Sequence, residues 1–413
     1  MKTVKQYVII GNGTAAIGCI EGIRSRDRDS DIIVVSQENR PAYCRPLISY
    51  YLEGKAHTER MSIRPDSFYE DMGCEVLYGV SAVKLDSNAK GVVLSDGIVI
   101  PYDELCVAVG SSPFVPPLAG LDTVKDKYTF LTLDDALSLE QAVNPDSRVL
   151  IVGAGLIGLK CAEGLHRRVK SITVCDLADR VLSSILDSEC AGIMQERLEK
   201  NGIRFLLGDS ADSFEGNTAK MKSGKTVEFD VLVLAVGVRA NTELVKTAGG
   251  EVNRGIIVDS AMKTTLPHVC AAGDCAEGVE MTTGEHRVIA ILPNAYMQGY
   301  TAGVNMAGGD AIFDNAVAMN SIGFFDLHCM TAGTYGGETT EERTETGIKR
   351  FYVKNGLLTG FIIIGDTDRA GIYTSLIRNK TPLDTLDFDA LKKSAGLMPF
   401  SRSDRGKMLG GVV

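Results

Sequence analysis

Two glycine-rich turns in this sequence have the residue types and the spacing that bind a dinucleotide. The first reads Tyr7-Val-Ile-Ile-Gly11-Asn-Gly13-Thr-Ala-Ala16, and the second reads Val149-Leu-Ile-Val-Gly153-Ala-Gly155-Leu-Ile-Gly158. In each, a short apolar strand enters a glycine turn that opens a helix, which brings backbone N–H groups against a pyrophosphate. A single turn of this kind also occurs for purely structural reasons. Two copies with matching flanks predict two dinucleotide sites, whose backbone contacts would come from Gly11, Gly13, Ala15, Ala16, Gly153, Gly155, Leu156, Ile157 and Gly158.

Each turn is followed by a second strand with a polar or acidic end. After the first turn that strand ends in Ser36-Gln37-Glu38, where an acid accepts hydrogen bonds from an adenosine ribose. Glu38 is the candidate and Gln37 the alternative, against the simpler interpretation of a solvated loop carboxylate. After the second turn the strand ends in Asp176, and a carboxylate there binds the ribose of NADH and repels the extra phosphate of NADPH. Arg180 weakens that inference without reversing it, so the sequence favours NADH.

The elements that must position these turns form a chain of 413 residues, long enough for two or three domains. Its net charge of −10 argues against a general nucleic-acid surface. The chain passes from its first five residues directly into a strand, and its apolar runs are too short to span a membrane, which predicts a cytoplasmic protein.

The ten cysteines favour a reducing compartment, because they are scattered and lie mostly in apolar segments. The sequence has no CxxC pair, so we predict no metal site. Cys270 and Cys275 have the spacing of some redox-active disulfides. Because Cys270 ends a strand that runs into a different motif, we interpret both as small buried residues.

Four further segments could contact a cofactor. The loop Arg40-Pro-Ala-Tyr43-Cys44-Arg45-Pro46 follows the second strand, and Arg45 there could bind phosphate oxygens or border an isoalloxazine ring. A buried strand ends in Ala108-Val109-Gly110-Ser111, and Ala235-Val236-Gly237-Val238 repeats this pattern, which indicates that the two units are structural repeats. A third strand ends in Gly273-Asp274, before a helix over 294–306.

This order of motifs resembles the FAD-dependent pyridine-nucleotide oxidoreductase family over nearly the whole chain. The most similar branch holds NADH:rubredoxin reductases, ferredoxin reductases of oxygenase systems and the flavin part of NADH-dependent nitrite reductases. The resemblance implies an α/β fold with two Rossmann-like domains and the cofactors FAD and NADH. It places an FAD domain at 1–113 and 241–314, an inserted NAD(H) domain at 114–240, and a small α+β interface domain with a tail at 315–413.

The resemblance also implies roles for particular residues. Asp274 would accept a hydrogen bond from a ribityl hydroxyl of FAD. The rest of the implied cofactor set is Arg45, Pro46, Val80, Ala108, Gly110, Ser111, Gly273 and Asn294 for FAD, and Arg180, Val236 and Gly237 for NADH. In the C-terminal domain, Asn355-Gly356 between two β-rich runs predicts a hairpin. The tail from Ser394, which carries several basic residues, is interpreted as disordered or as a docking segment.

Two residues depart from the family pattern beside the expected flavin edge. Many relatives have Lys four residues after the proline of the Arg-Pro loop and Glu two residues after the third glycine of the second turn. This chain has Tyr50 and Lys160 there. We hypothesise that Lys160 stabilises reduced, anionic flavin while Tyr50 shapes the face on which the nicotinamide stacks. The alternative is that Lys160 extends to solvent.

The family resemblance implies hydride transfer between NADH and FAD, for which the protein aligns the two rings. The leading hypothesis is an NADH-dependent oxidoreductase whose other substrate is rubredoxin, ferredoxin or an iron–sulfur subunit, acting as a homodimer or in a heteromeric complex. One alternative is a reductase of oxygen, persulfide or coenzyme A disulfide that uses Cys44, whose pKa Arg45 could lower. Another is a low-turnover nucleotide-binding subunit, for which Lys160 and the unusual Val109 argue.

Overall fold

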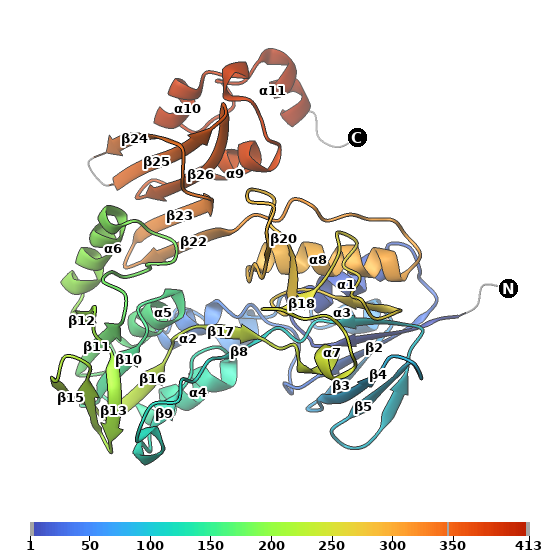
Figure 1. Ribbon diagram of the computed structural model, residues 1–413, viewed down its shortest axis with the longest axis horizontal. Coiled ribbons are helices and arrows are strands. Elements are labelled where there is room, and N and C mark those ends of the chain that lie inside the picture. Colours follow the sequence, from blue (N-terminus) through green and yellow to red (C-terminus); the bar gives the residue numbers. More distant parts are fainter. Residues whose placement is uncertain (1–3, 345–346, 410–413) are drawn as a thin grey trace. The chain divides into compact units, whose positions relative to one another are not determined.

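The computed structural model describes residues 4–344 and 347–409, which divide into two compact units (Figure 1). The first unit contains the chain up to Leu177, Ile203–Glu280 and Glu285–Ala316. The second contains Ala178–Gly202, Met281–Gly284 and the chain from Val317 onward. No helix within the described ranges is long and apolar enough to cross a membrane.

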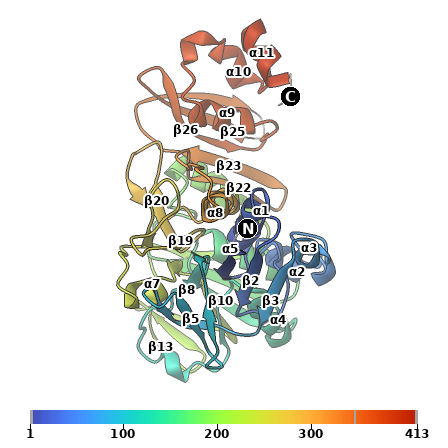
Figure 2. The ribbon, with the colours of Figure 1, turned by 90° about the vertical axis from the view of Figure 1, so that its right-hand side faces the viewer.

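A parallel sheet forms the centre of the first repeat. Its strand order is β19-β7-β1-β2-β3, and every neighbouring pair is parallel. The strands are β1 (Gln6–Ile10), β2 (Asp31–Ser36), β3 (Cys74–Tyr78), β7 (Glu104–Val107) and β19 (Val269–Ala271). Their runs of Val, Ile and Leu suit a sheet that is covered on both faces. Helices α1 (Thr14–Arg24) and α8 (Leu292–Met306) pack side by side (Figures 1 and 2).

The second repeat has the same arrangement. Its sheet has the order β12-β11-β10-β16-β9, again with parallel neighbours. The strands are β9 (Lys127–Tyr128), β10 (Arg148–Val152), β11 (Ser171–Asp176), β12 (Ile203–Leu207) and β16 (Val231–Leu234), with helices α4 (Leu133–Ala142) and α5 (Leu156–Leu165). Four strands correspond, because β12-β11-β10-β16 repeats the order β3-β2-β1-β7, and this confirms the prediction of two structural repeats. The fifth strand differs, since β9 precedes β10 in the chain whereas β19 follows β7. The two parallel sheets also confirm the predicted α/β fold class.

Each repeat carries a small antiparallel sheet, which is inserted between β3 and β7 in the first repeat and between β12 and β16 in the second. The first is formed by β4 (Ala82–Asp86), β5 (Gly91–Leu94) and β6 (Val99–Pro101), and the second by β13 (Ala211–Glu215), β14 (Thr218–Met221) and β15 (Thr226–Glu228). An antiparallel ribbon of β8 (Ser111–Pro113) and β17 (Val238–Ala240) joins the segments where the chain leaves the first repeat and returns to it. The boundaries that the sequence predicts between the FAD and NAD(H) domains fall beside this ribbon, and all the domain boundaries stay predictions.

The C-terminal part of the second unit is an antiparallel sheet in the order β22-β23-β26-β25-β24. The strands are β22 (Met319–Phe324), β23 (Leu327–Gly333), β24 (Glu338–Thr344), β25 (Gly347–Lys354) and β26 (Leu357–Ile364). The predicted hairpin is confirmed, because Asn355 (φ 53°) and Gly356 (φ 71°) join β25 to β26 in left-handed conformations. The same unit contains the helices α6 (Ser188–Lys200), α9 (Gly371–Arg378), α10 (Phe388–Lys393) and α11 (Arg402–Leu409).

The predicted tail, which starts at Ser394 directly after α10, contains α11, and residues 410–413 lie outside the described residues. The remaining short elements are α2 (Leu47–Leu52), α3 (Phe68–Asp71), α7 (Glu243–Thr247), β18 (Ile256–Ile257), β20 (Ala276–Val279) and β21 (His286–Arg287).

Candidate functional site

The first glycine of each turn is required by the fold of its own repeat. Gly11 has φ 107°, and a Cβ there would lie 2.1 Å from the carbonyl oxygen of Ala108, at the end of β7. Gly153 has φ 118°, and its Cβ would lie 2.2 Å from the carbonyl oxygen of Ala235, at the end of β16. The two turns therefore approach equivalent strand ends in equivalent ways, which keeps both helix N-termini at the carboxyl edges of their sheets.

The second glycine of each turn leaves the helix N-terminus accessible. Gly13 and Gly155 are the N-cap residues of α1 and α5, with φ −110° and −83°. A Cβ at either glycine would meet no atom of the described chain within 4 Å. Backbone N–H groups at a helix start have no partner inside the helix and bind phosphate well. Both turns thus fit the pyrophosphate of a dinucleotide.

Asp176 lies at the second turn, as its position at the end of β11 predicts. Its Oδ2 accepts a hydrogen bond of 2.7 Å from the backbone N–H of Ala154, between the two glycines. The carboxylate is therefore held against the turn that opens α5. Arg180 belongs to the second unit, where its guanidinium donates to Asp179 and to the carbonyl oxygen of Leu186.

Glu38 and Arg45, which the sequence suggested for two separate contacts, form an ion pair. Arg45 Nη2 lies 2.6 Å from Glu38 Oε1, and the hydroxyl of Tyr43 donates to Glu38 Oε2 at 2.8 Å. Gln37 is exposed, whereas Glu38 is half-buried. The pair fixes the Arg-Pro loop to the end of β2, and sequence spacing alone did not reveal it.

Asp274 is placed beside the first turn by Ser111 and Gly273. Ser111 Oγ lies 3.5 Å from Asp274 Oδ2, and Gly273 (φ 80°) donates its N–H to Gln298 Oε1 at 2.8 Å. Burial raises the pKa of Asp274, while the positive charge of Arg45 and the hydroxyl of Ser111 oppose that rise. Arg45, Ser111 and Asp274 are thus close enough to interact electrostatically. Asn294 is fully buried at the start of α8.

Tyr50 on α2 and Lys160 on α5 contact each other. Lys160 Nζ lies 4.6 Å from the centre of the Tyr50 ring and forms an ion pair with Glu163, one turn further along α5. The side chains of Lys160 and Glu163 are 17% and 6% exposed. The interpretation that Lys160 extends to solvent is therefore wrong. Sequence reasoning missed Glu163, although a carboxylate three residues after a lysine on a helix is a signal for such a pair.

Cys44 lies in the Arg-Pro loop, half-buried. Burial raises the pKa of its thiol, although the Leu47 N–H opposes that rise. The expectation that Arg45 lowers this pKa is wrong, because Arg45 is paired with Glu38. Cys270 and Cys275 are free and buried, so they form no disulfide in this structure.

The other cofactor contacts predicted from the sequence lie at or near the same strand ends. The N–H of Val80 donates to the carbonyl oxygen of Ser36 at the end of β2, and Pro46 is the N-cap of α2. The other residues that follow or flank the turns and strand ends are Ala15, Ala16, Ala108, Gly110, Leu156, Ile157, Gly158, Val236 and Gly237.

Asn241 is a further residue of this site that sequence reasoning missed. Its side-chain amide donates to the carbonyl oxygen of Val109 at 2.9 Å, and its backbone N–H donates to the carbonyl oxygen of Gly110 at 3.0 Å. Its Oδ1 accepts from Ser112 Oγ at 2.8 Å. Asn241 therefore holds the turn after β7 from the strand that returns from the second repeat. Its position just after the second small-residue turn was the only sequence signal.

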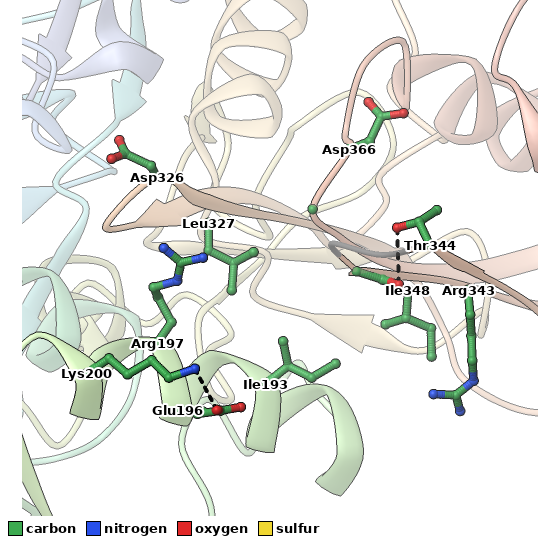
Figure 3. A pocket seen from close by; sticks show the side chains of 12 residues that line it. Ile193, Glu196, Arg197, Lys200, Asp326, Leu327, Arg343, Thr344, Ile348 and Asp366 are labelled. Atoms are coloured by element: carbon green, nitrogen blue, oxygen red, sulfur yellow. Dashed lines mark hydrogen bonds and ion pairs between the residues drawn. The ribbon is translucent and has the colours of Figure 1, made fainter.

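A cavity of about 740 Å³ lies in the second unit, and the residues that line it include none that the sequence selected (Figure 3). Its lining includes Glu196 and Lys200, which pair with each other on α6, and Arg343 on β24, which pairs with Glu189 and Glu341. These charges are already neutralised within the protein. The described residues contain no group of three or more His, Cys, Asp or Glu arranged to hold a metal ion.

A sequence profile of pyridine nucleotide-disulphide oxidoreductases matches residues 5–299, which include both glycine turns, Asp176 and Asp274. The chain belongs to this family. The resemblance predicted from the order of motifs is thereby confirmed. Members of the family bind FAD and a pyridine nucleotide, and the two turns fit these cofactors.

The relatives of the chain include a subunit of a larger enzyme, an oxidase of similar length and a longer reductase. The chain is 31% identical over 394 residues to the epsilon subunit of NADH-dependent phenylglyoxylate dehydrogenase from Aromatoleum evansii, covering 92% of this chain and 93% of that one. It is 33% identical over 318 residues to an NADH oxidase from Methanocaldococcus jannaschii, covering 74% and 71%. It is 29% identical to a nitrite reductase from Bacillus subtilis, covering 96% of this chain but only 49% of that protein.

The fold is also similar to solved structures. A putidaredoxin reductase in covalent complex with putidaredoxin superposes with a TM-score of 0.87 over 95% of this chain and 96% of that one, at 22% identity. At this identity the likeness concerns the fold alone.

Proposed function

We propose that this chain is an FAD-dependent oxidoreductase that passes electrons between NADH and a redox protein, either a small carrier such as rubredoxin or ferredoxin or an iron–sulfur subunit of its own complex. The observation that carries this proposal is the presence of two dinucleotide turns in one unit, with Tyr50 of the first repeat in contact with Lys160 of the second. Bound FAD and NADH supply hydride transfer from nicotinamide C4 to flavin N5.

The residues of the chain hold and align the two cofactors. The N-termini of α1 and α5 bind the pyrophosphates, and Asp176 binds the ribose of NADH and excludes the phosphate of NADPH. Asp274 and Ser111 orient the ribityl chain of FAD, and Asn241 fixes the turn that carries Gly110. Because the alignment of two rings governs such a transfer, these contacts are the protein's main contribution.

A protein acceptor is favoured over a thiol-dependent small-molecule reaction. A reactive cysteine needs a lowered pKa, and burial raises that of Cys44. Two relatives support the same choice. One is a subunit of a larger NADH-dependent dehydrogenase, and another is named a nitric oxide reductase FlRd-NAD(+) reductase. With its many free cysteines, the chain is proposed to work in the cytoplasm.

The decisive measurement is an anaerobic titration of the FAD-loaded protein with NADH. The proposal expects loss of the visible flavin absorbance with about one equivalent of NADH and re-oxidation by a one-electron protein acceptor. If excess NADH leaves the band unchanged, the chain is a nucleotide-binding subunit without turnover and the proposal is wrong.

The role of Lys160 is testable by two variants with opposite effects. Lys160 supplies a positive charge that Glu163 partly neutralises, so Lys160→Met removes the cation and Glu163→Gln exposes it. We expect the flavin reduction potential to fall in the first variant and to rise in the second. Equal potentials in both variants and the wild type would show that the pair only joins two turns of α5.

A further inference from the structure

Gln298 on α8 contacts the turn that carries Asp274. Its Oε1 accepts a hydrogen bond of 2.8 Å from the backbone N–H of Gly273, and Asp274 is the next residue in the chain. Gln298 is only 4% exposed. Because a buried N–H that loses its acceptor is costly, this hydrogen bond restricts where the turn can lie.

Gly273 lies between the N-terminal parts of two helices. A Cβ at Gly273 would lie 3.0 Å from the Cβ of Ala15 in α1 and 3.7 Å from the Cβ of Ala295 in α8. Gly273 has a φ of 80°, which favours glycine. The turn has no side chain at this point, so its position depends on the two helices and on Gln298.

Helix α8 packs on α1 so closely that their backbones touch (Figure 1). A Cβ at any of four glycines would lie 1.9–2.3 Å from a carbonyl oxygen of the other helix, at Gly18, Gly22, Gly299 and Gly303. Gly299 meets Ala15, and Gly303 meets Cys19, which lies four residues further along α1. The two helices therefore run parallel, and a larger side chain at these contacts would separate them.

Two consecutive residues of α8 contact two different parts of the FAD site. Gly299 packs on the carbonyl oxygen of Ala15, in the first turn of α1. Gln298 holds the N–H of Gly273, beside Asp274. The separation between the start of α1 and the turn of Asp274 is therefore determined by this one position on α8.

Gln298 also lines a cavity of about 200 Å³ within the first unit, together with Met262, Ile289 and Phe313. The Gly273 N–H fixes the orientation of the Gln298 amide, because the opposite orientation would place two N–H groups against each other. Since open space borders this side chain, packing alone does not orient it. The same space means that a side chain of similar size can replace glutamine without a clash.

We propose that Gln298 is a positioning residue of the FAD site, which acts through Gly273 to hold the Asp274 carboxylate at a fixed place relative to the start of α1. This inference rests on the proposed function, because it assumes that α1 binds the pyrophosphate and Asp274 the ribityl chain of the same FAD. These two parts of FAD are covalently joined, so the groups that bind them need a fixed separation.

The test compares Gln298→Leu with two other variants. Leucine removes the acceptor for the Gly273 N–H, whereas Gln298→Glu keeps a carboxyl oxygen that accepts it. Thr301 lies one turn further along α8 and is 6% exposed, so Thr301→Val controls for the loss of a buried polar group from this helix. The FAD dissociation constant is measured by fluorescence titration of the apoprotein. The visible flavin spectrum, kcat and the KM for NADH are measured in FAD-loaded protein with ferricyanide as acceptor.

We expect Gln298→Leu to raise the FAD dissociation constant about tenfold, because one buried N–H loses its acceptor. The visible flavin band should shift, and kcat should fall while the KM for NADH stays unchanged, since the flavin is displaced but the second glycine turn is intact. Gln298→Glu should restore most of the FAD affinity. Thr301→Val should leave all these values as in the wild type.

A milder variant keeps the proposal testable if Gln298→Leu does not fold. Gln298→Asn shortens the side chain by one methylene group, so its oxygen no longer reaches the Gly273 N–H, and it should raise the FAD dissociation constant by a smaller factor. Wild-type FAD affinity and spectrum in a folded Gln298→Leu, or in Gln298→Asn, would overturn the inference. Equal losses in Thr301→Val would also overturn it, because they would show general damage to α8. Failure of wild-type flavin reduction by NADH would instead overturn the proposed function, because FAD affinity is measured without NADH.

Discussion

A substitution of Gly155, the second glycine of the NADH turn, should affect nucleotide binding without affecting the stability of the fold. Gly155 has an ordinary φ of −83°, and a Cβ there meets no described atom within 4 Å. Alanine is a clearly poorer N-cap than glycine, but it loses less backbone entropy on folding, and the two effects are of similar size and opposite sign. We therefore expect Gly155→Ala to change the free energy of unfolding by less than about 0.5 kcal/mol.

The methyl group that Gly155→Ala adds lies where a pyrophosphate must approach the N-terminus of α5. Losing one or two hydrogen bonds to charged phosphate costs about 1.5 kcal/mol each. That loss corresponds to a rise of roughly 10- to 150-fold in the NAD+ dissociation constant. Gly153→Ala should differ, because its Cβ would lie 2.2 Å from the Ala235 oxygen at a φ of 118°. It should cost about 1–3 kcal/mol of stability or more, since a non-glycine residue is strained there.

The assay combines calorimetric NAD+ binding, FAD content from the visible spectrum, and urea unfolding of both variants. The expected pattern is weak NAD+ binding with normal stability and normal FAD in Gly155→Ala, and lowered stability in Gly153→Ala. Wild-type NAD+ affinity in Gly155→Ala would refute the assignment of this turn as the nucleotide cradle. Equal destabilisation of the two variants would refute the claim that the space at Gly155 is open.

Three further predictions follow from single side chains. Cys44→Ser should leave NADH-driven reduction of a protein acceptor within about twofold, since burial keeps the thiol protonated, and loss of steady-state turnover would instead favour a thiol mechanism. Asp176→Asn should lower the preference for NADH over NADPH about tenfold, measured as the ratio of kcat/KM, because the repulsion of the extra phosphate is lost. Burial of Asp27 opposes its charged form, but hydrogen bonds from Ser30 and Tyr7 outweigh this effect and lower the pKa of Asp27 from 3.8 to about 2. The stability that Asp27 contributes is therefore complete above about pH 4 and is lost as the pH falls towards 2. Acid unfolding followed by circular dichroism should show a shallower loss over that range in Asp27→Asn.

The sequence predicted the parts of the fold that depend on local patterns. The two glycine turns, the strand-end carboxylate Asp176 and the Asn355-Gly356 hairpin are each encoded within a few residues, so spacing and residue type were sufficient. The charge balance around Lys160 was missed because the family pattern concerns positions 50 and 160, whereas the charge that balances Lys160 is on Glu163. The role of Asn241 was missed because its partner Val109 lies 132 residues away in the sequence.

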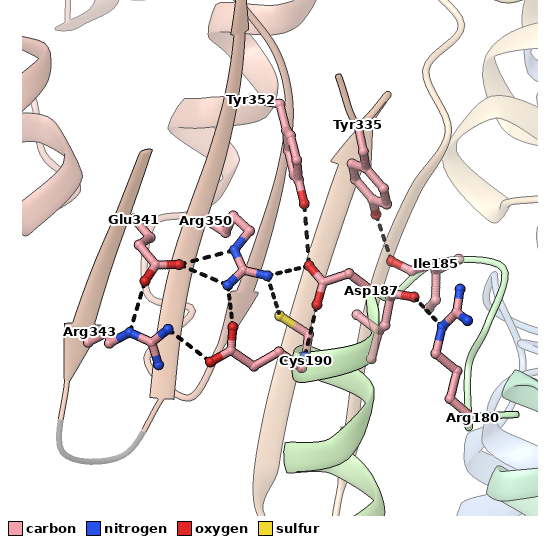
Figure 4. A network of polar contacts seen from close by, with 11 residues as sticks. Arg180, Ile185, Asp187, Cys190, Tyr335, Glu341, Arg343, Arg350 and Tyr352 are labelled. Carbon is pink, nitrogen blue, oxygen red and sulfur yellow. Dashed lines mark hydrogen bonds and ion pairs between the residues drawn. The ribbon is translucent and has the colours of Figure 1, made fainter. Parts of the chain in front are cut away.

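The two repeats differ in how the segment after the strand that follows the glycine turn and its helix is fixed. In each, an arginine binds a carboxylate in the segment that follows the second parallel strand. In the first repeat Arg45 and Glu38 are 7 residues apart, so the segment stabilises itself. In the second, Asp187 is bound by Arg350 at a separation of 163 residues, so the corresponding segment depends on a different sheet. The segment after this strand is thus fixed locally in the first repeat, whereas after β11 it is held by the C-terminal sheet (Figure 4).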